Sequence, residues 1–144
     1  MPVKPVPDGF HTVTPYLTVD DPDDLMNFMQ QAFGAAQREV TRDGGGNIRH
    51  AEVLVGDSIL MMGKARNEWH PRPASFYLYV PDCDAVYKKA IAAGGQSIQE
   101  PTNQFYGDRH GAVSDSQGNQ WWIATHVEDV PPEEIERRMK AATQ

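Results

Sequence analysis

The spacing of apolar residues predicts a helix over residues 21–33. The apolar positions recur at intervals of three and four, on one helical face, and are Leu25, Phe28, Met29, Ala32 and Phe33. Asp20-Asp21-Pro22 precedes them, and an Asp cap followed by proline is typical of a helix start. Gly34 follows the last apolar position and is expected to end the helix.

A second helix is predicted after Asp82, which is placed as its cap. Its apolar face comprises Cys83, Val86, Tyr87, Ala90 and Ile91. Gly94-Gly95 closes it. A last helix, over residues 133–141, follows Pro131-Pro132; its acidic start and basic end suit the helix dipole.

Alternating or β-branched stretches between these helices predict strands. We expect strands over residues 11–19, 38–41, 48–55, 58–62, 75–80, 96–99, 109–113 and 120–125. Residues 100–107 are expected to be a loop, and residues 115–119 a turn in which Gly118-Asn119 can take positive φ. In the last strand, Trp121 and Trp122 point to opposite faces, so one is core and the other borders a pocket.

The order of predicted elements occurs twice, which indicates an internal duplication. Three landmarks recur 61, 60 and 62 positions apart: Tyr16 with Tyr77, Arg49 with Arg109, and Gly56 with Gly118. Neither half could bury its sheet face alone, so we expect an α+β fold of two βαβββ modules whose mixed sheets form a shared cup. The expected single domain, 1–144, comprises module one (about 10–63), a linker (64–74), module two (about 75–126) and a C-terminal helix (132–141).

Composition narrows the classes of function. The net charge is −7 with scattered Lys and Arg, which argues against a nucleic-acid partner. No apolar run approaches the ~20 residues of a membrane helix. The residues before Asp8 are rich in proline and lack the apolar centre of a signal peptide, and Cys83 is the only cysteine. These features predict a cytoplasmic protein.

Three segments carry a resemblance to a known family: His50-Ala51-Glu52 with residues 56–62, residues 105–109, and residues 115–126. With the paired βαβββ order, they resemble the vicinal oxygen chelate superfamily, which contains glyoxalases, bleomycin-resistance proteins and extradiol dioxygenases, and its PhnB-like branch in particular. The resemblance covers roughly residues 12–125. This fold hosts both metal enzymes and metal-free binders, so whether the protein is an enzyme stays open.

The resemblance implies four metal-ligand positions, one on the first and one on the last strand of each module. They fall on Thr14, on Leu60 or Met61, on Ser75 and on Trp122. A hard divalent cation needs imidazole or carboxylate donors, which these residues do not supply. We therefore predict no metal and no cofactor; a divalent metal would follow only from a shifted register.

Ionisable residues elsewhere are candidates for catalysis. His50 and Glu52 are two positions apart and share a strand face, and His110 is the repeat mate of His50. One interpretation is a general acid/base pair, His50 with Glu52 or His110, in the cup of a metal-dependent lyase, isomerase or dioxygenase; a displaced metal site is a variant of it. The other is structural: both histidines bond to backbone across the hairpins and join the two halves.

A metal-independent binder of a small, partly aromatic molecule is the function that the residues favour. The expected ligand-binding residues are Tyr16, Met61, Tyr77, Tyr106, Arg109 and Trp122. Glu52, Asp108 and the negative net charge favour a cationic or hydrogen-bond-donating ligand, provided that Arg49 and Arg109 lie outside the cup. We also expect a homodimer, with the C-terminal helix as a candidate contact.

Overall fold

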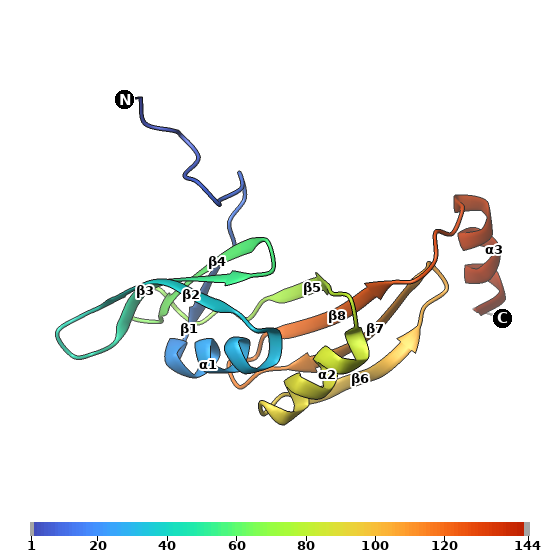
Figure 1. Cartoon of the computed structure of the whole chain (residues 1–144). Coiled ribbons are helices and arrows are strands. Elements are labelled where there is room, and N and C mark those ends of the chain that lie inside the picture. Colours follow the sequence, from blue (N-terminus) through green and yellow to red (C-terminus); the bar gives the residue numbers. More distant parts are fainter. Residues whose placement is uncertain (1, 143–144) are drawn as a thin grey trace.

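The computed structural model describes residues 2–142 and consists of two modules with the same order of elements (Figure 1). The first contains β1 (Tyr16–Val19), α1 (Pro22–Phe33), β2 (Ala36–Arg42), β3 (Ile48–Val55) and β4 (Ser58–Lys64). The second contains β5 (Ser75–Tyr79), α2 (Cys83–Ala92), β6 (Gln96–Asn103), β7 (Asp108–Ser114) and β8 (Gln120–His126), and α3 (Pro132–Ala142) follows.

The sheets confirm the duplication. Their strand orders are β1-β4-β3-β2 and β5-β8-β7-β6. In each sheet the first strand of the module pairs in parallel with the last one: β1 with β4, and β5 with β8. Equivalent neighbours face each other across these pairs: Tyr16 is opposite Met61, and Tyr77 is opposite Trp122. The expected α+β fold of two βαβββ modules with a C-terminal helix is therefore confirmed. The proposed domain limits include residues 1, 143 and 144, which lie outside the described residues.

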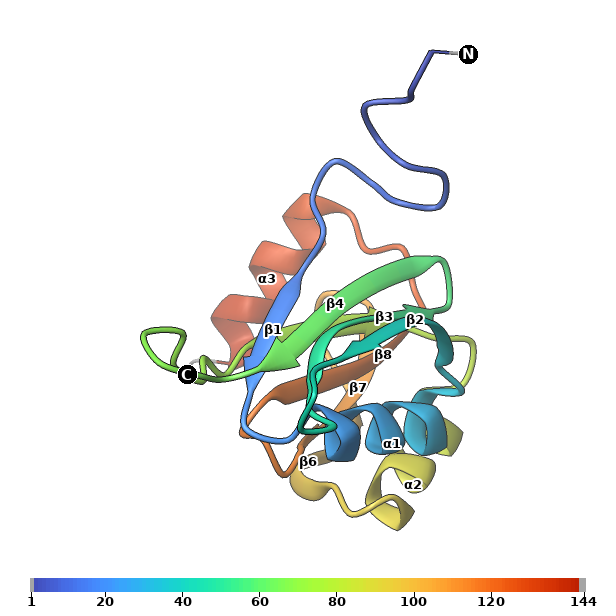
Figure 2. The same cartoon turned by 90° about the vertical axis from the view of Figure 1, so that its left-hand side faces the viewer.

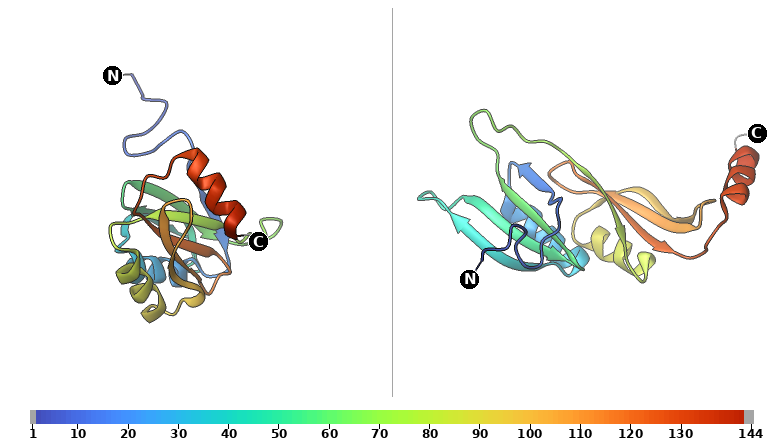
Figure 3. Two further views of the ribbon diagram at one scale, coloured as in Figure 1. Left: turned by 90° about the vertical axis from the view of Figure 1, so that its right-hand side faces the viewer. Right: turned by 90° about the horizontal axis from the view of Figure 1, so that it is seen from above.

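Helices α1 and α2 lie next to each other on one side of the two sheets (Figures 1 and 2). Each helix covers its own sheet, and the contact of α1 with α2 is the main packing between the modules. Seen from above, the two sheets lie side by side (Figure 3). We call the face of each sheet that points away from its helix the open face: it carries Tyr16, His50, Glu52 and Met61 in the first sheet, and Tyr77, Asp108, His110 and Trp122 in the second. Packing between the sheets therefore passes through the helices.

The helix ends follow the local sequence. Asp21 caps α1, its carboxylate accepting a bond from the Asp24 N–H at 3.1 Å, and Gly34 ends the helix at φ +66°. Asp82 caps α2 in the same way, accepting from the Ala85 N–H at 3.1 Å. These caps satisfy amide groups that have no partner within the helix.

Trp121 joins the two modules in the core. Its side chain is buried, its ring stacks on Phe76 at 4.5 Å between centroids, and it contacts Phe33 of α1 at 4.9 Å. The alternation of β8 places Trp122 on the opposite, open face, where it is half-buried. The tertiary structure thus decides which of the two tryptophans is core, which the sequence left open.

The turn between β7 and β8 is held by the carboxylate of Asp115. It accepts bonds from the backbone N–H groups of Gln117 and Asn119 and from the Asn119 side chain, and its Oδ2 accepts from Trp121 Nε1 at 2.7 Å. The Asn119 side chain in turn accepts from the Ala74 N–H at 2.9 Å, which ties the linker to the turn. Gly118 takes a positive φ as expected, whereas Asn119 does not; Asn119 is instead a buried linking residue.

Two strand limits differ from expectation by more than two residues. β1 begins at Tyr16 rather than at residue 11. β6 continues to Asn103, so the expected loop over residues 100–107 shrinks to residues 104–107. Pro101 is tolerated within β6 because this is an edge strand and its register against β7 shifts between Gln99 and Thr102.

We predict that Asp115→Ala lowers the free energy of unfolding by about 3 kcal/mol, because each buried donor left without a partner costs about 1–3 kcal/mol. Chemical denaturation followed by far-UV circular dichroism measures this. Asp57→Ala is the matched control, since Asp57 lies in an exposed turn of the first module, where its side chain accepts a hydrogen bond only from Ser58 among residues 2–142. Equal effects of the two substitutions would contradict a special role for Asp115.

Candidate ligand-binding site

Asp108 is the centre of a polar cluster on the open face of the second sheet. Its Oδ2 accepts hydrogen bonds from the hydroxyls of Tyr77 and Tyr79, at 2.7 and 2.9 Å, and its Oδ1 lies 2.9 Å from His126 Nδ1. Asp108 is only 3% exposed although it stands on an open face, because these three side chains surround it. The pairing of β7 with β8 sets Asp108 directly opposite His126.

The cluster holds Asp108 in its ionised form. Burial by itself would raise the pKa of this carboxyl, but the hydrogen bonds from His126, Tyr77 and Tyr79 outweigh burial and lower the pKa. The tyrosine pKa values move the other way. Burial, together with the bonds to Tyr106 and Asp108, raises the pKa of Tyr77, and the bond to Asp108 raises that of Tyr79. The site therefore presents a fixed negative charge beside two neutral hydroxyls.

His126 bridges this cluster and the segment that leads to α3. Its Nε2 lies 2.7 Å from the carboxylate of Asp129, so both ring nitrogens face carboxylates. Both can donate only when the imidazole is protonated. The bonds to Asp108 and then to Asp129 accordingly raise the pKa of His126. His126 and Tyr79 were not among the site residues predicted from the sequence. They lie two positions after Ala124 and Tyr77, and side chains two apart on a strand share a face, which was the available signal.

Beside the acidic cluster, Trp122, His110 and Tyr106 form an aromatic wall. The His110 ring meets Trp122 edge to face at 5.4 Å, and its Nε2 lies 2.9 Å from the Tyr106 hydroxyl. Tyr77 connects wall and cluster, since its ring lies 5.7 Å from that of His110. His110 is 6% exposed, and its Nδ1 is buried without a hydrogen-bond partner among the described residues. Because this nitrogen is shielded from solvent, only a rearrangement of the aromatic wall would bring it into contact with a ligand.

The open face of the first sheet carries the expected His50–Glu52 pair. His50 Nε2 lies 3.2 Å from Glu52 Oε2, and the His50 ring lies 6.0 Å from that of Tyr16. His50 and His110 stand in different sheets, and each bonds a side chain of its own module. The interpretation in which both histidines bond to backbone across the hairpins is therefore wrong. The expected ligand-binding residues divide in the same way: Tyr16 and Met61 lie in the first sheet, and Tyr77, Tyr106 and Trp122 in the second module.

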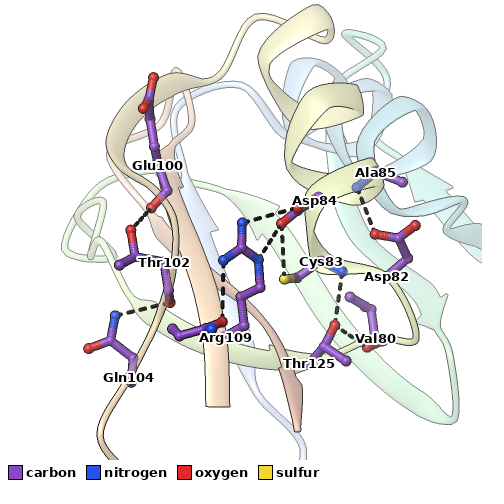
Figure 4. Close-up of polar contacts among 11 residues, drawn as sticks. Val80, Asp82, Cys83, Asp84, Ala85, Glu100, Thr102, Gln104, Arg109 and Thr125 are labelled. Atoms are coloured by element: carbon purple, nitrogen blue, oxygen red, sulfur yellow. Dashed lines mark hydrogen bonds and ion pairs between the residues drawn. The ribbon is translucent and has the colours of Figure 1, made fainter. Parts of the chain in front are cut away.

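Arg109 is directed away from the other expected ligand-binding residues. Its guanidinium binds Asp84 of α2 through Nε and Nη2, at 2.9 and 3.2 Å, and Nη1 donates to the Asn103 side chain (Figure 4). Both its neighbours, Asp108 and His110, point to the open face, so Arg109 belongs to the helix side of β7. Its bonds there link β7 to α2 and to β6.

Comparison with known proteins places this arrangement in a family. The family model of the glyoxalase/bleomycin resistance protein/dioxygenase superfamily matches residues 9–123. The chain belongs to this superfamily. A protein of Mycobacterium bovis, Mb0911c, which is described only as uncharacterized, is 29% identical over 140 residues that cover 90% of this chain and 92% of that one.

Solved structures agree on the fold of this superfamily member. TioX from Micromonospora sp. ML1 has a TM-score of 0.71 at 23% identity and covers 81% of this chain and 99% of its own. The PhnB protein from Bacillus cereus has a TM-score of 0.65 at 19% identity and covers 80% and 99%. At these identities the likeness shows the fold alone, and a protein named PhnB is among the structures that share this fold.

The metal positions of the superfamily carry unsuitable donors in this member. The two parallel strand pairs place Met61 beside Tyr16 and Trp122 beside Tyr77, while Thr14 lies before β1 and Leu60 faces the core. The positions that the resemblance implies offer the hydroxyls of Thr14 and Ser75, the thioether of Met61 and the indole of Trp122, all of them poor ligands for a hard divalent cation. Within residues 2–142, moreover, no three His, Cys, Asp or Glu side chains are grouped so that they could hold a metal ion. The residues at the usual positions therefore do not fit the metal.

No helix within residues 2–142 is both long enough and apolar enough to cross a membrane. The cytoplasmic location stays a prediction.

We predict that His126→Asn lowers the thermal unfolding midpoint most at about pH 5.5 and progressively less above neutral pH. The folded pKa of His126 is raised, so its contribution to stability is complete below the ordinary value of 6.5 and is lost as pH rises through the raised pKa. Differential scanning fluorimetry between pH 5.5 and 9 measures the midpoint. His11→Asn, in the exposed N-terminal arm, is the control. A loss for His126→Asn that is constant with pH would contradict the assignment.

Proposed function

We propose that this superfamily member binds a small, partly aromatic molecule on the open face of the second sheet without the usual metal. The observation that carries the proposal is the Tyr77–Trp122 cross-strand pair, which remains accessible in the chain: Tyr77 is 42% exposed and Trp122 is half-buried. A flat ring stacked on such side chains gains roughly 0.5–1.5 kcal/mol beyond the burial of its area.

The electrostatics of the cluster support a cationic or hydrogen-bond-donating ligand. Asp108 is ionised and Asp129, whose side chain is fully exposed, adds a second carboxylate, so the two exceed by one charge the single positive charge that His126 carries when protonated. A cationic ligand was expected only if Arg49 and Arg109 lie outside the site. Arg109 meets this condition, because it is bound to Asp84 outside the open face, and Arg49 belongs to the first sheet. The ligand would thus place its ring against Trp122 and its donor group toward the acidic side.

The second candidate is a lyase, isomerase or dioxygenase in which His50, Glu52 and His110 act on a substrate. The 3.2 Å contact between His50 and Glu52 favours it, because a carboxylate bonded to an imidazole can orient that imidazole for acid/base chemistry. Two observations favour the binder instead. His50 and His110 are engaged in separate modules, and the superfamily's metal positions carry Met61 and Trp122.

A ligand screen tests the binding function. We expect flat cationic or quinone-like compounds to raise the unfolding midpoint and change tryptophan fluorescence, with or without a chelator, and Trp122→Ala to weaken binding by about tenfold through lost stacking and contact area. Trp69→Phe is the matched control, since Trp69 is an exposed tryptophan of the linker. Compounds that bind folded Trp122→Ala as tightly as the wild type would contradict the proposal, and so would a response that the chelator abolishes.

We further propose a homodimer, supported by apolar surface that a single chain leaves exposed. In α3, Ile135 is half-buried and Met139 is 45% exposed, and none of its residues is fully buried. The helix stands at the far end of the second module, held by Arg138, which donates to Glu128 and to the Phe105 carbonyl (Figure 1). Such a helix would bury its apolar stripe against a second copy.

We expect light scattering at micromolar concentration to give twice the chain mass, and Ile135→Glu/Met139→Glu to shift the protein toward a monomer. A charge placed in an apolar contact loses its hydration without gaining a partner. Glu133→Lys, at the exposed start of α3, is the control. A monomer mass for the wild type would contradict the dimer.

A further inference from the structure

A hollow of about 250 Å³ lies on the first module, apart from the open face of the second sheet. It is formed where β1 and the end of β4 meet the loop that follows β4, which projects beside β1 in Figure 2. Its lining residues are Tyr16, Thr18, Arg49, Gly63, Lys64, Arg66 and Trp69. Three of the seven are cations and none is an acid, in a chain whose net charge is −7.

These cations are weakly compensated. The Lys64 ammonium donates to the backbone carbonyl of Asp20 at 2.9 Å, which positions it without neutralising its charge. Within residues 2–142, Arg49 forms one ion pair, in which its Nη1 lies 3.9 Å from Asp43 Oδ2. The Arg66 side chain has neither an ion pair nor a hydrogen bond with any residue in the described range 2–142. A gathering of uncompensated cations of this kind raises the local concentration of anions.

The floor of the hollow is shaped by Gly63. A Cβ at this position would lie 2.6 Å from the Tyr16 hydroxyl and 2.8 Å from the Arg49 carbonyl oxygen, so the tyrosine lies directly over the glycine. Only a residue without a side chain permits this approach. The Tyr16 ring, 52% exposed, thereby forms one wall.

Trp69 also lines the hollow and lies on a short turn. Arg66 and Trp69 exchange two backbone hydrogen bonds, at 2.9 and 2.7 Å, and Asn67 between them takes the left-handed conformation at φ +48°. Trp69 is nevertheless 61% exposed. A turn closed at both ends that leaves a tryptophan in water beside an arginine suits a ligand better than it suits packing of the chain itself.

We infer that this hollow binds an aromatic anion: a ring between Tyr16 and Trp69, with a carboxylate or phosphate group held by Arg49, Lys64 and Arg66. The planar guanidinium group matches both oxyacids, since it donates two parallel hydrogen bonds to either. Asp20 beside Lys64, Asp43 beside Arg49 and Glu68 in the turn are acids on these segments, and none of them lines the hollow. The second sheet carries the opposite charge, so one chain would distinguish two ligand classes at two places.

Calorimetric titration with phenyl phosphate, benzoate, benzylamine and benzyl alcohol tests the inference at low and at high salt. We expect at least one of the two anions to bind, more weakly at high salt, while the alcohol and the amine do not bind in the hollow. Arg49→Gln and Arg66→Gln should each weaken anion binding by about tenfold or more, as the loss of a charge-assisted bond implies. Both arginines are exposed, so the unfolding midpoint of each variant is enough to check that the variant folds. Phenyl phosphate and benzoate identify which oxyacid is preferred.

Two further variants separate this site from the proposed function. Lys89→Gln removes an exposed cation of α2 and controls for net charge. Trp122→Ala alters only the second sheet and should leave anion binding unchanged. The inference is overturned if neither anion binds, if the alcohol binds as tightly as the anions, if Lys89→Gln weakens binding as much as Arg66→Gln, or if Trp122→Ala abolishes anion binding while the arginine variants keep it. Failure of the cation and quinone screen would refute the proposed function and leave this site standing.

Discussion

The arrangement of the two modules depends on the contacts of the buried Trp121. Its ring lies against Phe76 of its own module and Phe33 of α1, and its indole N–H is bound by Asp115. The same turn reaches the start of α1, where the Gln117 side chain accepts from the Asp21 N–H. Because a buried ring and a buried carboxylate must both be satisfied, the second sheet has one position relative to the first helix.

This arrangement of the modules leaves the open faces of both sheets accessible. Equivalent positions of the two modules carry different side chains on these faces. Tyr16 beside Met61 corresponds to Tyr77 beside Trp122 in the registers of the two sheets. Around the first pair the chain has gathered cations, and around the second it has buried Asp108 under tyrosine hydroxyls and His126. One backbone plan thus supports two electrostatic environments, because side chains on an open face can change without disturbing the core.

Membership in the superfamily establishes the fold, and the residues of the site limit the chemistry. The strand positions at which the resemblance implies metal ligands carry side chains that are poor donors for a hard divalent cation. Asp108 illustrates the difference: in the open it could serve as a ligand or a base, but three donors already occupy its oxygens. Its remaining effect is the charge that it projects toward the face.

The sequence by itself determined the elements, their caps and the duplication, because helical and strand periods, Asp caps and turn glycines act over a few residues. It also placed Trp121 and Trp122 on opposite faces and His50 with Glu52 on one face. Only the tertiary structure decided which tryptophan is core, that β6 passes through Pro101 at a sheet edge, and that Arg109 binds Asp84. Asp108 is bonded to Tyr79 and His126, which come from other segments of the chain. Arg49 and Trp69, also from separate segments, line one hollow. Such contacts depend on strand order and register, which a local pattern does not encode.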